Sequence, residues 1–265
     1  MEATTKLLRA AIMSIIMDRE CAYLVMTEVC AVRQRWKKYM LGCVLLVFAV
    51  VLAWTTGEQV VQAIAQSHAA RTLVIDAGHG GFDGGAIGSN GTTEQDINLS
   101  IAKRVQLLAS FFGVQTEMTR EDTNALDYDP SRPVRENKVS DIKARQKIVE
   151  QTANPIFLSI HLNKFSDAQY HGAQVFYSTN HAGGCALAEL LQDALITGCD
   201  PSNTRQAKPA DQSIYLMKVL DCPAVIVECG FLSNPSEEEL LGDSSYHKKL
   251  AASIVTGYLR YESGV

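Results

Sequence analysis

Cysteine pairs at the spacing of metal ligands are missing from this chain of 265 residues. It contains seven cysteines, but none of them forms a CxxC pair and their spacing follows no regular framework. The pattern therefore argues against a structural zinc knuckle and against a disulfide-rich scaffold. A single bridge, Cys185–Cys199 or Cys222–Cys229, stays open as an alternative, although unpaired thiols in the core are the expectation.

The chain also lacks an excess of basic residues outside its first forty positions. The net charge is -5, and residues 1–40 hold seven Lys/Arg against four Asp/Glu, which leaves the rest of the chain at -8. Proteins that bind nucleic acid need a basic face that neutralises phosphates. We therefore expect no nucleic-acid partner.

The glycine-rich segment 78–85 lacks the residues that accompany glycines in nucleotide sites. It contains no Lys-Ser/Thr pair of the P-loop kind. Asp83 stands where the dinucleotide-binding fingerprint needs its third glycine. The segment is therefore interpreted as a tight turn after a strand and not as a phosphate-binding loop.

Internal repeats and low-complexity linkers are absent from residues 71–265, where short apolar runs alternate with periodic segments. The runs that predict strands are 73–76, 114–119, 156–161, 172–178 and 224–228. The segments that predict helices are 94–112, 140–151, 185–196 and 246–261, with polar loops at 120–139 and 201–212. Strands that alternate with helices imply βαβ units. We predict one α/β domain over residues 71–265, with a mostly parallel twisted sheet covered by helices on both faces.

The segment before this domain combines a basic flank, residues 33–38, with an uncharged apolar run, residues 40–54. This order is typical of a signal peptide or an N-terminal membrane anchor. Fifteen residues are fewer than the about 20 that a span needs, so a buried helix is the alternative. We predict a cytoplasmic segment at 1–39, a signal or anchor at 40–57, a linker at 58–70 and an exported domain. A wrongly assigned start codon is a further interpretation of the first thirty-odd residues.

Four ionisable residues lie where predicted strands end or where the first predicted helix begins. His79 follows the first strand, His161 and Glu228 end later apolar runs, and Glu94 opens the first helix. The carboxyl ends of parallel strands meet at one edge of an open sheet, so we expect these side chains to lie together. Two imidazoles and a carboxylate suit a catalytic Zn²⁺, and a second carboxylate can then move the proton of the attacking water. The set indicates metal-assisted hydrolysis of an amide.

Each of these residues also has a purely structural explanation. His79 is equally well explained as a polar cap after a strand, and Glu94 as a first-turn carboxylate favoured by the helix dipole. His161 and Glu228 are harder to explain in this way, because each ends a strongly apolar strand. Asp76 is interpreted either as the acceptor that orients a metal-bound histidine or as a turn cap. The remaining histidines are expected on the surface or in loops: His68, His171, His181 and His247.

The segments around these residues resemble the zinc-dependent N-acetylmuramoyl-L-alanine amidases of the type-3 amidase family. The resembling segments are 74–88 (VIDAGHGGFDGGAIG), 94 with 98–99, 118–120, 159–163 (SIHLN) and 223–234 (PAVIVECGFLSN). The resemblance covers nearly all of residues 72–261 and implies a three-layer α/β sandwich. It implies one zinc ion bound by His79, Glu94 and His161, with Glu228 as the catalytic carboxylate. The implied substrate is the amide between N-acetylmuramic acid and L-alanine in peptidoglycan.

Within the family, the chain is most similar to the spore-cortex branch, whose germination-specific amidases help to make muramic δ-lactam. Residues 135–145 and 213–216, the short N-terminal segment and the absence of wall-binding repeats are the basis of this similarity. An activating protein partner is compatible with it. Two other functions stay open, namely a zinc peptidase that acts on stem peptides and an inactive peptidoglycan-binding module. Arg120 and Asn163 are candidates for contacts with the substrate.

Overall fold

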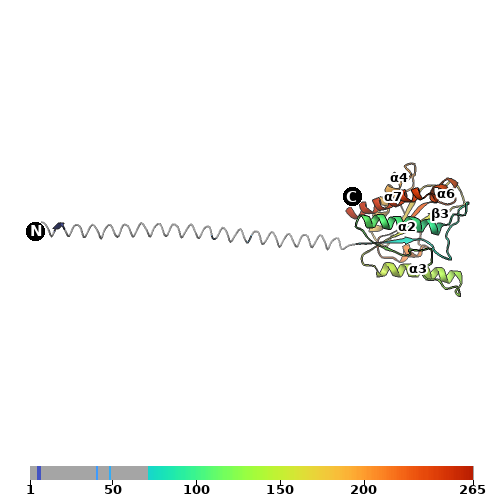
Figure 1. Cartoon of the computed structure of the whole chain (residues 1–265), viewed down its shortest axis with the longest axis horizontal. Coiled ribbons are helices and arrows are strands. Elements are labelled where there is room, and N and C mark those ends of the chain that lie inside the picture. The colour runs from blue at the N-terminus through green and yellow to red at the C-terminus, as the bar shows by residue number, and fades with distance from the viewer. Residues whose placement is uncertain (1–4, 7–39, 41–47, 49–70, 265) are drawn as a thin grey trace. The chain divides into compact units, whose positions relative to one another are not determined.

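The computed structural model describes residues 5–6, 40, 48 and 71–264 (Figure 1). Residues 71–264 belong to one compact unit. Among the described residues, no helix is both long enough and apolar enough to cross a membrane. The predicted signal or anchor at 40–57 lies outside the described residues except for Met40 and Phe48, and so do the linker 58–70 and His68.

A six-stranded sheet forms the middle layer of the described domain, in the spatial order β2-β1-β3-β6-β4-β5. The strands are β1 (Thr72–Ala77), β2 (Gln115–Met118), β3 (Pro155–Asn163), β4 (Gln174–Tyr177), β5 (Lys208–Pro209) and β6 (Ala224–Phe231). Neighbours pair in parallel except β4 and β6, which are antiparallel. The sheet is therefore mixed and mostly parallel, and the α/β prediction is confirmed.

Helices cover both faces of this sheet. They are α2 (Glu94–Phe111), α3 (Val134–Gln151), α4 (Gly183–Gly198), α5 (Tyr215–Val219), α6 (Pro235–Gly242) and α7 (Ser244–Ser263). Figure 1 shows α2, α4 and α7 on one side of the sheet and α3 on the other. Because side chains alternate along a strand, Leu73 and Ile75 of β1 pack in the core under the first group, whereas Val74 packs in a second core with residues of α3 and α5.

Helix α3 begins at Val134, six residues before the predicted start, so the prediction of a loop up to residue 139 is wrong in its last part. The first two turns show no apolar stripe because Val134 and Val139 are exposed. Their buried residue is the polar Asn137, whose side-chain amide donates to the backbone oxygen of Asp129 and accepts from its backbone nitrogen. A helix start that is held to the preceding loop by polar contacts gives no periodic hydrophobic signal.

Helix α6 was not predicted either, although its start has an ordinary cap. The side chain of Asn234 accepts hydrogen bonds from the backbone nitrogens of Ser236 and Glu237, and Pro235 occupies the first turn. An N-cap asparagine followed by proline is a recognised helix start. Short elements of this kind, including α5 and β5, are fixed by caps and by tertiary packing more than by periodicity.

Two expectations about buried side chains have different outcomes. Cys185, Cys199, Cys222 and Cys229 are all free, which confirms unpaired thiols in the described domain. His247 is buried in α7, so its predicted surface position is wrong. Its Nε2 lies 2.6 Å from the backbone oxygen of Leu241 and its Nδ1 lies 2.9 Å from the hydroxyl of Ser100. Both ring nitrogens are thus satisfied, which lets an imidazole occupy the interior. His171 and His181 are exposed, as expected.

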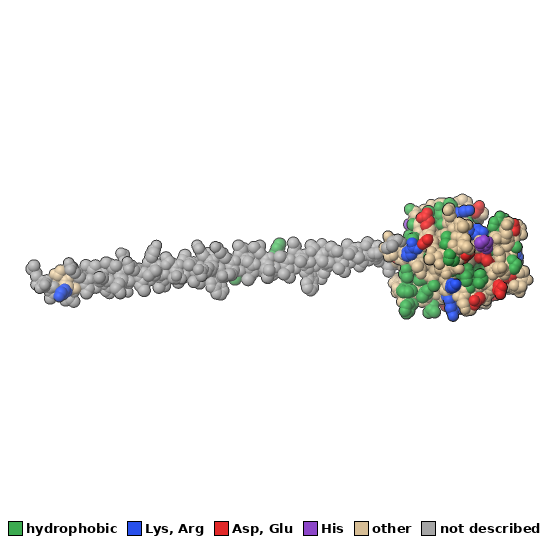
Figure 2. Space-filling model, turned by 90° about the horizontal axis from the view of Figure 1, so that it is seen from above, with side chains coloured by type: hydrophobic (Ala, Val, Ile, Leu, Met, Phe, Trp, Pro, Cys, Tyr) green, Lys and Arg blue, Asp and Glu red, His purple; other side chains and the backbone are tan. Residues whose placement is uncertain are grey.

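The surface of the domain carries charges of both signs. On the face that Figure 2 shows, Lys and Arg side chains are interspersed with Asp and Glu side chains, and hydrophobic side chains lie between them. No single sign of charge dominates that face.

Candidate active site

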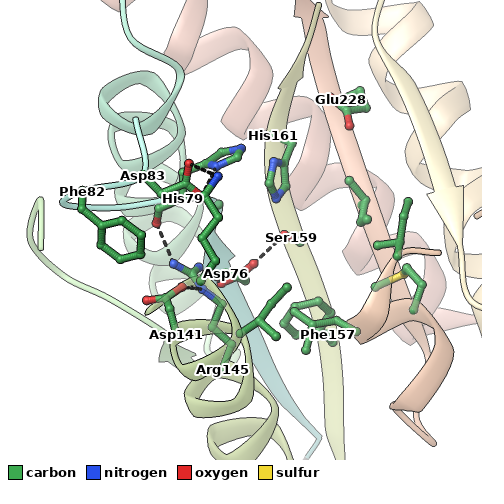
Figure 3. A pocket seen from close by; sticks show the side chains of 17 residues that line it. Asp76, His79, Phe82, Asp83, Asp141, Arg145, Phe157, Ser159, His161 and Glu228 are labelled. Atoms are coloured by element: carbon green, nitrogen blue, oxygen red, sulfur yellow. Dashed lines mark hydrogen bonds and ion pairs between the residues drawn. The ribbon is translucent and has the colours of Figure 1, made fainter. Parts of the chain in front are cut away.

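Polar side chains of three neighbouring strands gather on the face of the sheet that α3 covers (Figure 3). Asp76 of β1, Ser159 and His161 of β3, and Glu228 of β6 line one cavity there. His161 and Glu228 are direct neighbours in the ladder between β3 and β6. Both lie inside their strands, which continue to Asn163 and Phe231, so the prediction that these two residues end their strands is wrong. The sequence had shown only the apolar part of each strand.

Glu94 lies between two imidazoles. Its Oε1 is 3.2 Å from Nε2 of His79 and 3.0 Å from Nδ1 of His161. The two rings stand edge to face with their centroids 4.9 Å apart. One ligand atom from each of the three residues lies within 4.8 Å of the others. Two imidazole nitrogens and one carboxylate oxygen in this arrangement could hold a metal ion.

The backbone fixes the carboxylate of Glu94 from two directions. The backbone nitrogen of Leu162 donates to Oε1 at 3.0 Å, and that of Ala86 donates to Oε2 at 2.8 Å. Asn98, one turn further along α2, donates to Oε1 at 3.4 Å and to the backbone oxygen of Gly78 at 3.2 Å. A carboxylate with this many fixed donors is held in one position when α2 and β3 pack together.

The glycine-rich segment brings the two histidines close to Glu94. A Cβ atom on Gly78 would lie 2.3 Å from the ring of His161, and one on Gly85 would lie 2.6 Å from Oε2 of Glu94. Gly85 also has a φ of +70°, which favours glycine. His79 itself has a φ of 62°, a left-handed conformation that non-glycine residues rarely adopt. Backbone strain of this kind, held by surrounding structure, is concentrated at functional sites.

Asp83 contacts the outer nitrogen of His79. Its Oδ2 lies 3.0 Å from Nδ1 of His79, and its Oδ1 accepts a hydrogen bond of 2.9 Å from Nζ of Lys138. A carboxylate on the far nitrogen of a metal-binding histidine fixes the ring orientation. Asp76 was predicted as a candidate for this contact, whereas Asp83, four residues after His79 in the glycine-rich segment, was not.

Asp76 instead belongs to a buried network with Arg145 of α3. Arg145 Nη1 lies 2.5 Å from Asp76, whose carboxylate also accepts from the hydroxyls of Thr119 and Ser159 at 2.7 and 2.6 Å. The same guanidinium donates to the backbone oxygen of His79 at 2.6 Å. Burial would raise the pKa of Asp76, but the charge of Arg145 and the two hydroxyls hold it below its usual value. This network anchors the strained backbone at His79 to α3.

Arg120 also has a structural role, so the proposal that it contacts substrate is not supported. It is buried, and its guanidinium donates to the backbone oxygens of Ala77, Gly78 and Gln95 at 2.8, 3.0 and 2.8 Å. Asn163, the second candidate for a substrate contact, is the last residue of β3 and remains a prediction.

Glu228 differs from the other carboxylates of the site because its Oε2 is buried and has no hydrogen-bond partner. Burial raises the pKa of Glu228 to about 7, although the charge of the neighbouring His161 opposes the change. A carboxylate with a pKa near neutrality can both accept and release a proton at physiological pH. This is the electrostatic state that acid–base catalysis requires.

The acidic surroundings of His79 favour its protonated form. Burial would lower the pKa of His79, but hydrogen bonds to Asp83 and Glu94 raise it to about 9. Burial likewise would raise the pKa of Glu94, yet hydrogen bonds with His161 and His79 lower it well below its usual range. The cluster therefore favours positive charge between its side chains, in the form of protons or of a cation.

A cavity of about 300 Å³ opens beside these groups. Figure 3 shows His79, His161 and Glu228 at one end of it and Phe157 at the other. Apolar side chains from β3, α5 and β6 form much of its remaining wall, among them Leu216, Met217 and Ile226. Reactive groups in a partly apolar cavity are the usual arrangement of an enzyme active site.

Residues 73–260 match the family model described as N-acetylmuramoyl-L-alanine amidase. The chain belongs to the N-acetylmuramoyl-L-alanine amidase family. The activity of this family is hydrolysis of the amide between N-acetylmuramic acid and L-alanine in peptidoglycan, which confirms the expected enzyme class. The match spans every residue of the cluster described above.

Individual amidases resemble the chain over most of its length. It is 34% identical to the germination-specific N-acetylmuramoyl-L-alanine amidase of Bacillus subtilis (strain 168), over 86% of this chain and 94% of that protein. It is 28% identical to the amidase AmiA of Escherichia coli (strain K12), over 72% and 76% of the two chains.

A solved structure shares the fold. The CwlD amidase from Clostridioides difficile, determined in complex with the GerS lipoprotein, is 38% identical with a TM-score of 0.71, and the match covers 73% of this chain and 99% of that chain. Nearly the whole of that amidase therefore matches about three quarters of the present chain. The resemblance to germination-specific amidases inferred from the sequence is confirmed.

Proposed function

We propose that the chain hydrolyses the muramoyl–L-alanine amide as a zinc enzyme, with His79, Glu94 and His161 as the metal ligands and Glu228 as the acid–base catalyst. One observation carries this proposal: three ligand atoms within 4.8 Å of one another lie beside a carboxylate with a buried, unpartnered oxygen. The peptidase and binding-module alternatives explain this combination less well, because the family match is to amidases and the acid–base group is present.

The donor set fits zinc. Zn²⁺ binds imidazole nitrogen and carboxylate oxygen, and catalytic sites keep three protein ligands. Asp83, on the outer nitrogen of His79, supplies the supporting contact that zinc-bound histidines usually have. When bound there, Zn²⁺ polarises the carbonyl under attack and lowers the pKa of a water to about 7.

Glu228 carries out the proton transfers. Its carboxylate accepts a proton from the attacking water and then delivers that proton to the nitrogen of L-alanine as the amide bond breaks. Its pKa of about 7 suits both steps. Its Oε2 has no partner, so it can accept the proton without first losing a hydrogen bond. His161 is the direct neighbour of Glu228 across the ladder, so a proposed metal ligand and the proposed acid–base group lie side by side.

We propose further that the domain acts outside the cytoplasm in spore-cortex maturation, with residues 40–57 serving as its export signal or membrane anchor. The chain is 34% identical to a germination-specific amidase over 94% of that protein. This similarity supports the cortex role, including muramic δ-lactam formation. The structure of a similar amidase in complex with a lipoprotein supports a protein partner for this chain, and we propose that this partner activates it.

The test is to purify residues 66–265 with and without Glu228→Gln and to measure zinc content and release of stem peptides from muramic acid. We expect about one zinc per chain in both proteins and peptide release by the wild type alone. Release of an intact stem peptide with a free L-alanine amine identifies the amidase, whereas shorter peptides identify a peptidase. A wild-type protein that binds no zinc overturns the ligand assignment, and a zinc-loaded inactive one indicates a missing partner or a modified substrate.

A further inference from the structure

The catalytic face continues past Glu228 onto the next strand. In the antiparallel ladder between β6 and β4, Gln174 is the direct neighbour of Glu228, which in turn neighbours His161 of β3. Paired residues point to the same face of a sheet and are roughly 5 Å apart. His161, Glu228 and Gln174 therefore form a row that leads from the metal cluster toward the β4 edge of the sheet.

Arg205 lies at the far end of this row. Its Nη1 donates to Oε1 of Gln174 at 2.9 Å, and its Nε donates to the backbone oxygen of His171 at 2.7 Å. The guanidinium also lies over the ring of Phe231, 4.5 Å from the centroid, and 5.9 Å from that of Tyr170. Two hydrogen bonds and two ring contacts hold the side chain in one orientation.

This arginine has no acidic partner. Within residues 71–264, no Asp or Glu forms an ion pair with Arg205. Four other arginines of the domain each pair with a carboxylate: Arg71, Arg132, Arg145 and Arg260. Holding a long cationic side chain in one orientation costs rotamer entropy. A fixed guanidinium whose Nη2 has no partner in the domain is preorganised for an anion from outside.

The surroundings of Arg205 favour the same kind of ligand. It lines a surface groove of about 480 Å³ together with Lys208, His171 and uncharged polar side chains, and no acidic residue lines that groove. Two carboxylates lie just outside the groove. Oδ2 of Asp200 is 3.9 Å from Nδ1 of His171, and Glu237 accepts hydrogen bonds from the backbone nitrogens of Gly172 and Phe231. In a chain with a net charge of -5, this groove concentrates positive charge.

We propose that Arg205, assisted by Lys208, binds a carboxylate of the stem peptide on the leaving-group side of the scissile amide. The inference rests on the proposed function. The proton donor must lie beside the nitrogen that leaves, and this nitrogen belongs to the peptide. Because Glu228 lies between the metal cluster and Gln174, the peptide extends from Glu228 along the row toward Arg205.

The dimensions agree with this placement. Glu228 and Gln174 are roughly 5 Å apart across the ladder, and the guanidinium of Arg205 lies one hydrogen bond of 2.9 Å beyond Oε1 of Gln174. Two extended residues span about 7 Å before their side chains are counted. A carboxylate on the second residue of the peptide can therefore reach Arg205. The planar guanidinium is the side chain best matched to a carboxylate in two-point contact.

The test compares two substrates that differ in one group, muramoyl-L-alanyl-D-glutamate and muramoyl-L-alanyl-D-isoglutamine. The second replaces the α-carboxylate of the second residue by a carboxamide. We expect wild-type kcat/KM to be about 10- to 100-fold higher for the acid, as for loss of one charge-assisted hydrogen bond. Arg205→Gln should remove this preference by lowering kcat/KM for the acid alone, and Arg205→Lys should restore part of it.

Three further measurements keep the outcome clear. Lys208 is exposed, so Lys208→Gln should leave the fold intact, and it should lower the preference for the acid several-fold. This variant keeps the inference testable if Arg205→Gln fails to fold. Arg260→Gln, which removes an exposed arginine of α7, should leave the preference unchanged. NMR titration of the full domain with L-alanyl-D-glutamate and L-alanyl-D-isoglutamine measures binding without catalysis. Equal rates and equal binding for acid and amide overturn the inference. Tighter binding of the acid without hydrolysis of either substrate supports the subsite, and the missing hydrolysis then indicates a missing partner or a modified substrate.

Discussion

Asp76 and Glu228 are carboxylates on the same face of one sheet, in the same cavity, and their surroundings could hardly differ more. Asp76 accepts hydrogen bonds from Arg145, Thr119 and Ser159, and its pKa lies below its usual value. Glu228 leaves a buried oxygen without a partner, and its pKa rises to about 7. The first carboxylate is a fixed charge and the second is a proton carrier.

The difference shows how one fold separates stability from chemistry. Complete pairing makes a buried charge part of the framework, and its removal is felt by the whole domain. Incomplete pairing leaves a carboxylate free to change its protonation state during a reaction. Substitutions in the Asp76 network should therefore change the stability of the domain, whereas substitutions of Glu228 should change its activity.

The largest effect is expected from Glu228→Gln. Loss of the acid–base group should lower kcat for peptide release by about 10²- to 10⁴-fold. Zinc content and the unfolding temperature should stay close to the wild-type values, because the carboxylate has no partner to lose. Metal analysis and thermal unfolding of the same samples provide the control, and activity within a few-fold of the wild type would contradict the assigned role.

Arg145→Leu should lower the free energy of unfolding by about 3–5 kcal/mol, because Asp76 is left as a buried charge without its cation. Urea unfolding measures the change. The matched control is Arg260→Leu, which breaks an exposed pair with Asp193 and should cost less than about 1 kcal/mol. The double variant Asp76→Asn, Arg145→Leu tests whether the two residues are coupled. A loss of unfolding free energy equal to the sum of the losses in the two single variants would show that they are not.

Asp83→Asn should weaken zinc binding by about 10- to 100-fold while leaving the fold intact, because the carboxylate acts through Nδ1 of His79. Competition with a chromogenic chelator gives the affinity directly. Asp211→Asn, at an exposed carboxylate distant in sequence from the cluster, serves as the comparison and should show no change. Equal zinc affinity in all three proteins would leave Asp83 only its contact with Lys138.

The smallest effect is a pH dependence of stability. The pKa of Asp76 is lowered in the folded state, so its contribution is present above the unfolded value of 3.8 and disappears as the pH falls through the lower folded value. Urea unfolding of the zinc-free wild type and of Asp76→Asn should therefore show a difference in stability that shrinks as the pH drops below about 4. A difference that is constant from pH 6 to pH 3 would show that Asp76 does not titrate in this way.

The sequence was sufficient for the elements with a strong hydrophobic pattern. Strands β1, β3 and β6 and helices α2, α4 and α7 all appear near their predicted positions, since each buries an apolar face. The four residues His79, Glu94, His161 and Glu228 were also predicted to lie together, because their positions follow from the topology of a parallel sheet. Family resemblance then proposed a role for each.

The parts that were missed depend on side chains that meet only in the folded chain. Arg145 lies on α3, 66 residues from the backbone oxygen that it holds at His79, and no local pattern indicates this contact. Arg205 lies in a loop that looked merely polar, and its position is set by Gln174 and Phe231. The polar start of α3 was read as a loop for the same reason. Polar contacts between distant segments do not produce a periodic signal.

The spatial order of the strands also has a consequence for the way in which the enzyme is made. The proposed zinc ligands all precede residue 162, but β6, which carries Glu228, inserts between β3 and β4 in the finished sheet. A nascent chain that has emerged only as far as β5 holds every ligand and lacks the strand at the centre of the site. Hydrolysis must therefore wait for the last strand of the sheet, because a shorter chain lacks the proposed acid–base residue.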